Sequence, residues 1–169
     1  MNYELMIETF PKLLVGLSIT IQLVTISLFI GFCLAIGLAL LRLSKHPFLN
    51  FFAKTYVFYF RGTPLLVQIF LIYYGIGQFE SVRESFVWIF FKDAYWCGIL
   101  ALTLNTCAYS SEIIRGGIQS VPFGQIESAR STGMSGFLLY RRIILPIAFR
   151  QALPAYGNEM ILMVRQLHW

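Results

Sequence analysis

The sequence predicts an all-helical integral membrane domain, and two observations carry this prediction. Of the 169 residues, 57% are apolar and 12% are charged, whereas soluble domains are about 45–50% apolar and about 25% charged. Three uncharged runs, each of at least 18 residues, follow one another along the chain, and about 17–20 apolar residues suffice to cross a hydrocarbon core. This pattern excludes an ordinary soluble domain and predicts a single membrane domain over residues 1–169.

The three full spans are predicted at about residues 13–41, 56–79 and 94–111, each bounded by charged residues. In the second span the aromatic residues before Gly62 extend the helix backwards, and Pro64 is tolerated near its start or as a kink.

The basic residues predict the orientation, because cytoplasmic loops carry an excess of lysine and arginine. One side holds nine of them (Arg42, Lys45, Lys54, Arg61, Arg115, Arg130, Arg141, Arg142 and Arg150) and the other side three (Lys12, Arg83 and Lys92). The N-terminus is therefore expected outside and the segment 112–150 in the cytoplasm. With the net charge of +5 explained in this way, membrane lipid is expected as a contact and nucleic acid is not.

Small and polar residues occupy defined faces of the predicted spans. Gly31, Ala35 and Ala39 recur every four residues, which favours close contact with another helix. Thr103 and Thr106 share one face of the third span, and Asn105 lies on a neighbouring face. Such faces turn toward a water-filled path or, as an equal alternative, make hydrogen bonds between helices with no solute involved.

The segment 112–150 is predicted to contain two short helices joined by a hinge. Residues 125–132 form a good helical run, which Gly133 is placed to end in a left-handed conformation. Ser135 can begin the second helix, and Pro146 disturbs or ends it. From these residues alone the segment is either an ordinary solvated loop or a docking element for a partner.

Two motifs resemble those of a known family, the permeases of ABC importers. The family's EAA loop is matched by Glu127-Ser128-Ala129, three residues, Gly133, nine residues, Ile143, one residue and Leu145-Pro146, with Ser128 where a second alanine is usual. The start of the second core span in the polar amino acid subgroup is matched by Arg61-Gly62-Thr63-Pro64-Leu65-Leu66-Val67-Gln68. Residues 101–109 and 153–159 also look like histidine/lysine/arginine-type permease subunits.

The resemblance implies the fold of a type I ABC importer transmembrane domain in the bacterial inner membrane. Two permease chains, identical or different, would sit on a dimer of ABC ATPase subunits, and a periplasmic or lipoprotein binding protein would deliver an amino acid from outside. The chain would be a transport subunit and not an enzyme. It contains no G-x-x-x-x-G-K-[ST] string, so ATP is expected on the partner subunit and no cofactor or metal on this chain.

The resemblance also implies roles for the residues of the cytoplasmic loop. The positions expected to couple to the ATPase are Glu127, Ser128, Ala129, Arg130, Gly133, Ile143, Leu145 and Pro146. Ala129 would let the partner approach, Glu127 would pair with its basic residues, and Gly133 would allow the sharp turn. The loop would act as a rigid lever between the ATPase and the spans.

The predicted substrate path comprises Arg61, Gly62, Thr63, Pro64, Gln68, Thr103, Asn105, Thr106, Asn158 and Glu159. An acidic group at membrane depth is costly without a partner, so Glu159 is expected to receive the cationic group of a basic amino acid such as arginine, histidine or lysine. The alternative is an ion pair with Arg150 or Arg165, or a place in the interfacial region.

The last predicted element is a partial span at 151–169. The run between Arg150 and Arg165 contains no charged residue except Glu159. It corresponds to about 21 Å of helix, which is too short for a hydrocarbon core of about 30 Å. The final residues, Gln166 to Trp169, also depart from the family pattern. The sequence is therefore expected to be a truncated permease, with an incomplete fourth span and a missing fifth, and a change of reading frame is favoured over a clean deletion.

Three alternative functions remain open at this stage. The chain could be an inactive membrane remnant or a scaffold that transports nothing. A membrane-embedded enzyme has the least support, because the spans hold no paired carboxylates and the only histidines are His46 and His168.

Overall fold

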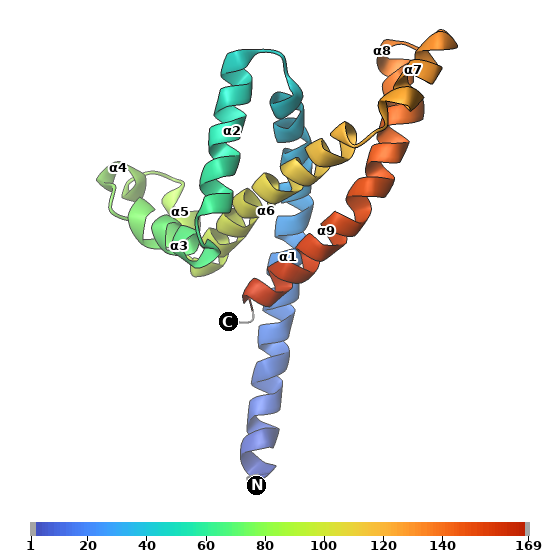
Figure 1. The fold of residues 1–169 in the computed structure, drawn as a ribbon. Helices are drawn as coiled ribbons and strands as arrows, with labels where there is room; N and C mark the ends of the chain where they lie inside the picture. Colours follow the sequence, from blue (N-terminus) through green and yellow to red (C-terminus); the bar gives the residue numbers. More distant parts are fainter. Residues whose placement is uncertain (1–2, 168–169) are drawn as a thin grey trace.

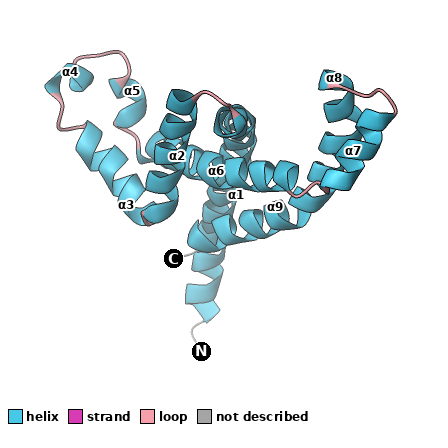
Figure 2. Cartoon of the chain, turned by 45° about the horizontal axis from the view of Figure 1, so that its top comes forward, coloured by secondary structure: helices cyan, strands magenta, loops and turns pink. Residues whose placement is uncertain are grey.

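The computed structural model describes residues 3–167, with side chains described for 10–165. All regular structure in this range is helical (Figure 2), which confirms the predicted fold class. The elements are α1 (Tyr3–Leu43), α2 (Pro47–Gly62), α3 (Leu65–Phe70), the π-helical turn η1 (Leu71–Gly75), α4 (Glu80–Arg83), α5 (Trp88–Phe91), α6 (Ala94–Gln119), α7 (Phe123–Ser131), α8 (Gly136–Leu139), the π-helical turn η2 (Tyr140–Ile144) and α9 (Leu145–Leu167).

The centre of the fold is the crossing of α1 and α6, on which α2 and α9 also pack (Figure 1). Gly31 makes the close approach possible, since a Cβ atom there would lie 2.9 Å from the Thr106 Cβ. Ala35 and Ala39 are fully buried. The predicted small-residue contact is therefore confirmed, and α6 is its partner. Segments α3–α5 extend to one side of this crossing and α7–α8 to the other (Figures 1 and 2).

Two of the described helices are long and apolar enough to cross a membrane, α1 over Phe10–Leu43 and α6 over Ala94–Gln119. They contain the predicted spans 13–41 and 94–111. The predicted second span, 56–79, is wrong as a single helix, because α2 and the α3–η1 helix meet at an angle of 107°. The physical reason is Pro64, which lacks an N–H group and disfavours a helical conformation for Thr63 before it.

The bounds predicted for the cytoplasmic loop, 112–150, are also corrected. Helix α6 continues to Gln119, and Pro146 does not end a helix. A continuous helical stretch runs from Gly136 through η2 and α9 to Leu167. The π-helical turn at 140–144 ends two residues before Pro146 and widens the helix where a proline ring would meet the carbonyl of Arg142.

The element predicted as a partial span at 151–169 is the C-terminal part of α9. This helix has 23 residues, about 34 Å in length, because it begins at Leu145 and includes the charged Arg150 that bounded the sequence-based estimate. His168 and Trp169 lie outside the described residues.

Candidate functional site

Residues 118–148 form a compact unit at the far ends of α6 and α9, which we call the loop unit (Figure 1). It has an apolar core of its own, and each core residue is 6% exposed or less: Val121, Ala129, Leu139, Ile144 and Ala148. Ile118 of α6 and Ile147 of α9 pack against the same core. The segment is therefore a folded part of the molecule and not a solvated loop, and apolar contacts join it to two long helices.

A Schellman turn at Gly133 ends α7. Gly133 has a φ of +84°, its N–H donates to the Arg130 carbonyl at 2.9 Å, and the Met134 N–H donates to the Ala129 carbonyl at 3.1 Å. This pair of bonds satisfies the last carbonyls of the helix and requires a left-handed residue between them. The conformation predicted for Gly133 is thus confirmed.

The role expected for Ala129 is wrong. Its side chain is 6% exposed and belongs to the core of the loop unit, so its small size lets α7 pack on α8 and η2, not on a partner. By contrast, Glu127, Ser128 and Arg130 are exposed on α7, where another protein can reach them.

The other predicted coupling positions divide between core and surface. Ile143 is half-buried against the core, while Leu145 and Pro146 are exposed at the start of α9. Sequence reasoning missed two exposed aromatic residues on this unit, Phe123 at 65% and Phe137 at 77% exposure. The sequence could have indicated both residues, because they are large apolar side chains within a polar segment.

The break between α2 and α3 is held by a buried pair of amides, Gln68 of α3 and Asn105 of α6. The Gln68 side-chain amide donates to the carbonyls of Phe60 (2.8 Å) and Thr63 (3.0 Å) and to the Thr63 hydroxyl (2.8 Å). Its oxygen accepts from Asn105 Nδ2 at 3.0 Å. Asn105 also donates to the Phe60 carbonyl at 3.4 Å. These bonds satisfy carbonyls that the break removes from the helical ladder.

Three of the predicted path residues lie on the same break. Thr63 is partly buried at the end of α2, whereas Gly62 and Pro64 are exposed on either side of it. Carbonyls exposed by a broken helix at membrane depth need partners from neighbouring helices. The Gln68–Asn105 pair supplies them and so joins α2, α3 and α6 at one point.

Arg61 at the end of α2 and Glu159 of α9 carry opposite charges. The Arg61 guanidinium lies 5.1 Å from the centroid of the Tyr109 ring of α6. The Glu159 carboxylate of α9 is half-buried. Within residues 10–165, Glu159 forms no ion pair with Arg150 or Arg165, the partners considered from sequence. Asn158, beside it, is exposed.

Thr103 and Thr106 lie in the packed contact between α1 and α6. Both are buried, at 4% and 2% exposure, and a side chain at Gly31 would touch the Thr103 carbonyl and the Thr106 side chain. The Thr106 hydroxyl donates to the Met163 sulfur of α9 at 3.5 Å. Thr106 thus makes a hydrogen bond between helices, whereas the Thr103 hydroxyl has no hydrogen-bond partner within the described residues.

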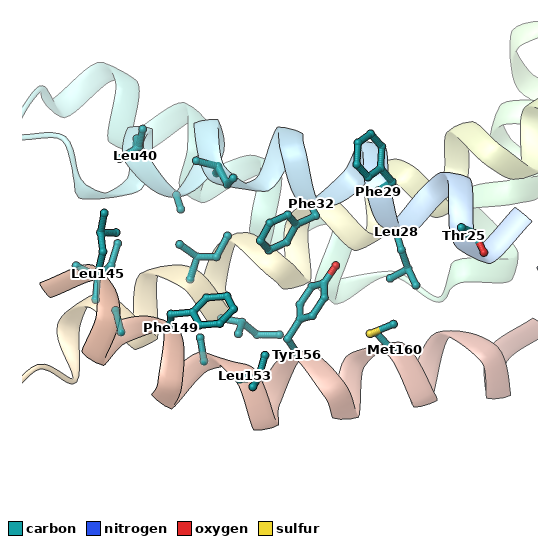
Figure 3. A pocket seen from close by; sticks show the side chains of 17 residues that line it. Thr25, Leu28, Phe29, Phe32, Leu40, Leu145, Phe149, Leu153, Tyr156 and Met160 are labelled. Atoms are coloured by element: carbon teal, nitrogen blue, oxygen red, sulfur yellow. The ribbon is translucent and has the colours of Figure 1, made fainter. Parts of the chain in front are cut away.

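An apolar groove of about 630 Å³ lies between α1, α6 and α9. Figure 3 shows Tyr156 projecting from α9 toward α1 and α6, and its ring meets Phe32 edge-on at 5.1 Å between centroids. The hydroxyls of Thr25 and Tyr156 are the polar side-chain groups of the lining. Such a surface suits an apolar helix or chain and not a charged solute. Within the described residues no group of three or more metal-ligating side chains occurs.

Comparison with known proteins decides the family. Residues 10–168 match the family described as "Binding-protein-dependent transport system inner membrane component". The chain belongs to this family. It is therefore a multi-pass inner membrane component of a transport system and not an enzyme.

The chain is similar in sequence to several named permease proteins. The chain is 57% identical to the nopaline transport system permease protein NocM of Agrobacterium fabrum, over 98% of this chain and 69% of the relative. It is 55% identical to the octopine transport system permease protein OccM of Rhizobium meliloti, over 94% and 64%. It is 49% identical to the histidine/lysine/arginine/ornithine transport system permease protein HisM of Escherichia coli, over 88% and 63%. The chain thus spans about two thirds of the length of these relatives.

A solved structure has the same fold. The crystal structure of an amino acid ABC transporter with histidines aligns with a TM-score of 0.86 and 36% sequence identity, covering 99% of this chain and 74% of that chain. The family resemblance noted from the loop and span motifs is confirmed.

Proposed function

We propose that this chain is the permease subunit of an ATP-driven importer that carries a basic amino acid across the bacterial inner membrane. The observation that carries the proposal is the loop unit, whose core includes Ala148 of α9 and packs against Ile118 of α6. A force applied to α7 would pass through this core into two long helices because tightly packed interiors transmit displacement. A solvated loop would absorb the same force.

The exposed surface of the loop unit supports docking to an ATPase dimer. Glu127 and Arg130 offer charges, and Phe137 offers apolar area, a combination typical of protein interfaces. ATP would bind to that partner, and this chain would bind no cofactor. A second permease chain, identical or different, and an amino-acid-binding protein complete the proposed assembly. The N-terminus would lie outside and the loop unit in the cytoplasm.

The proposed cargo rests on Glu159 and on the names of relatives. HisM is named for histidine, lysine, arginine and ornithine transport, and the Glu159 carboxylate lacks an ion pair with Arg150 or Arg165 within residues 10–165. A cationic side chain would offset the cost of a carboxylate at membrane depth.

The cargo is tested with the chain in proteoliposomes together with an ATPase and a binding protein of the histidine/lysine/arginine type. Glu159→Gln should lower arginine uptake roughly 10-fold or more and weaken the preference for arginine over glutamine. Glu84→Gln, which alters an exposed carboxylate outside the helical core, is the matched control. Unchanged selectivity in Glu159→Gln would refute the role of Glu159.

Coupling is tested with Glu127→Arg, which reverses an exposed charge without entering the core. We expect weaker binding of the ATPase and loss of substrate-stimulated ATP hydrolysis, while the isolated chain keeps its thermal stability. Glu84→Arg is the control for charge alone. A membrane scaffold that transports nothing would show no difference between the two variants, and that result would overturn the importer proposal.

A further inference from the structure

The apolar groove between α1, α6 and α9 has walls of large side chains and a floor of small ones. Phe29 of α1 and Phe149 of α9 line it and are mostly exposed, whereas Ala39 and Ala148 line it and are buried. The alanines leave the hollow of about 630 Å³ that the larger side chains border. A lining of this kind gains from contact with another apolar group that fills it closely.

The shape of the groove suits a hydrocarbon chain better than a helix. Figure 3 shows Thr25 and Met160 at one end of it and Leu40 and Leu145 at the other. The stretch of α1 from Thr25 to Leu40 is about 22 Å long. A helix with its side chains is about 10–12 Å wide, so over this length it would fill roughly 2,000 Å³, about three times the hollow. An acyl chain is narrower and follows a bent path.

Basic side chains lie just beyond the Leu40–Leu145 end of the groove. Arg141 precedes Leu145 by one turn of a continuous helix, so the two residues lie on the same side of it. Arg142 is next to it, and Lys45 follows the end of α1; all three basic residues are exposed. Basic clusters at the cytoplasmic ends of membrane helices attract the headgroups of anionic lipids.

The charges of Arg141 and Arg142 are not neutralised within the fold. The ion pairs within 4.0 Å among residues 10–165 both use the Glu112 carboxylate, which binds Arg42 and Arg115. No acidic residue lines the groove. A guanidinium presents N–H groups in a planar fork that matches two phosphate oxygens. This end of the groove therefore complements an anionic headgroup, and the groove itself complements an apolar chain.

We propose that the groove binds one anionic phospholipid of the cytoplasmic leaflet, with an acyl chain between α1 and α9 and the phosphate at Arg141 and Arg142. One leaflet of the hydrocarbon core is about 15 Å deep, so the chain would fill more than half of the groove. Ala148 belongs to the core of the loop unit and Ile118 packs against that core, and both also line the groove. The lipid would thus join the loop unit to α1. The choice of leaflet rests on the proposed orientation, whereas the site is independent of the cargo.

Native mass spectrometry of the purified chain in detergent tests the headgroup end of the site. The probes are phosphatidylglycerol and phosphatidylcholine with identical acyl chains, because the ammonium group of phosphatidylcholine would face the basic residues. The wild-type chain should retain one phosphatidylglycerol about 10–30-fold more tightly, since each basic residue near an anionic surface contributes about 5-fold. The double variant Arg141→Gln/Arg142→Gln should lower this ratio to about 1–2-fold. Arg83→Gln removes an exposed arginine of α4 and should leave the ratio unchanged.

The acyl end of the site has a separate readout. Ile36→Trp enlarges a half-exposed side chain of the groove lining and should lower retention of both lipids about 10-fold through overfilling, without changing their ratio. Leu34→Trp makes a comparable change at a similarly exposed position of α1 outside the lining and should change neither. Phosphatidylglycerol should also slow hydrogen exchange in residues 120–144 of the wild-type chain more than in the double arginine variant.

Three results would overturn the lipid site. Equal retention of the two lipids by the wild-type chain would refute the headgroup assignment, and equal effects of Ile36→Trp and Leu34→Trp would refute the groove as the acyl site. A second copy of the chain seated in the groove would give a dimer without retained lipid that Ile36→Trp dissociates, and this result would also refute the proposal. Arginine uptake is not measured in these experiments, so the proposed function stands or falls separately.

Discussion

In the loop unit the chain closes around an apolar core, whereas at the α2–α3 break it closes around two buried amides. Ala129 and Leu139 are 6% and 4% exposed within an entirely apolar cluster. Gln68 and Asn105 are 2% and 7% exposed and are joined by a hydrogen bond of 3.0 Å. Two equally buried places in one molecule therefore use opposite kinds of interaction.

The difference follows from the surroundings of each region. The loop unit is a charged segment in contact with water, where burial of apolar surface contributes about 25 cal/mol per Å². Between membrane spans this driving force is absent, since lipid tails are as apolar as the side chains, and close packing and hydrogen bonds take its place. The comparison predicts that polar substitutions and size changes have different costs in the two regions.

The largest effect is expected from Gln68→Leu, which keeps the volume but removes both the donor and the acceptor of the amide. The carbonyls of Phe60 and Thr63 and the Asn105 side chain would lose partners at membrane depth, at a cost of about 3 kcal/mol. The thermal unfolding midpoint in detergent should fall by roughly 5–10 °C. Gln78→Leu, at an exposed position, is the control, and equal midpoints for the two variants would contradict the importance of the break.

Ala129→Leu should cost about 2 kcal/mol by overfilling the core of the loop unit. The damage should remain local, so that hydrogen exchange rises in residues 120–144 while α1 and α6 stay protected. Ser128→Leu adds the same side chain at the exposed neighbouring position and should leave exchange unchanged. Exchange that rises equally throughout the chain would show that the loop unit is not a separate core.

Gly133→Ala is expected to destabilise the loop unit by about 1 kcal/mol, because a side chain disfavours the left-handed conformation at φ +84°. Space is not the obstacle, since a Cβ atom at this position meets no other atom within 4 Å. Gly124→Ala, in the same helix unit and also with open space, has no positive φ and serves as the matched control. Proteolysis within residues 120–144 should increase in Gly133→Ala alone.

The smallest effect on stability is expected from Phe137→Ser, within about 0.5 kcal/mol, because the side chain is 77% exposed. Its effect should instead appear in the affinity for the ATPase, measured by co-purification at increasing salt concentration. A large loss of thermal stability would show that Phe137 belongs to the fold and not to a docking surface.

Features set by neighbouring residues could be predicted from the sequence, and features set by distant contacts could not. The left-handed Gly133 follows from the end of a helical run three residues after Arg130. The burial of Ala129 depends on Leu139 and Ile144, which reach it only after the chain reverses. The continuation of the helix through Pro146 likewise depends on the π-helical turn before it, for which the sequence carries no distinct pattern.

The predicted path residues illustrate the same limit. Arg61, Gln68 and Asn105 were identified from motifs, but the hydrogen bond that joins Gln68 to Asn105 crosses 37 positions of sequence. The 107° bend beside it exceeds the kink expected of Pro64. The placement of Thr106 against Gly31 likewise depends on a residue of a different helix, far away in the sequence.

The sequence by itself determined the membrane class, the apolar runs and the glycine that reverses the chain, because hydropathy and local backbone preference act on consecutive residues. The tertiary structure decided which polar groups meet: the two amides at the α2–α3 break, two threonines in the contact of α1 with α6, and the Arg61 guanidinium over the Tyr109 ring. The reason is physical, since between helices in lipid the hydrophobic pattern does not distinguish one face from another. There, packing and the hydrogen-bond partners of buried polar groups determine which helix faces meet.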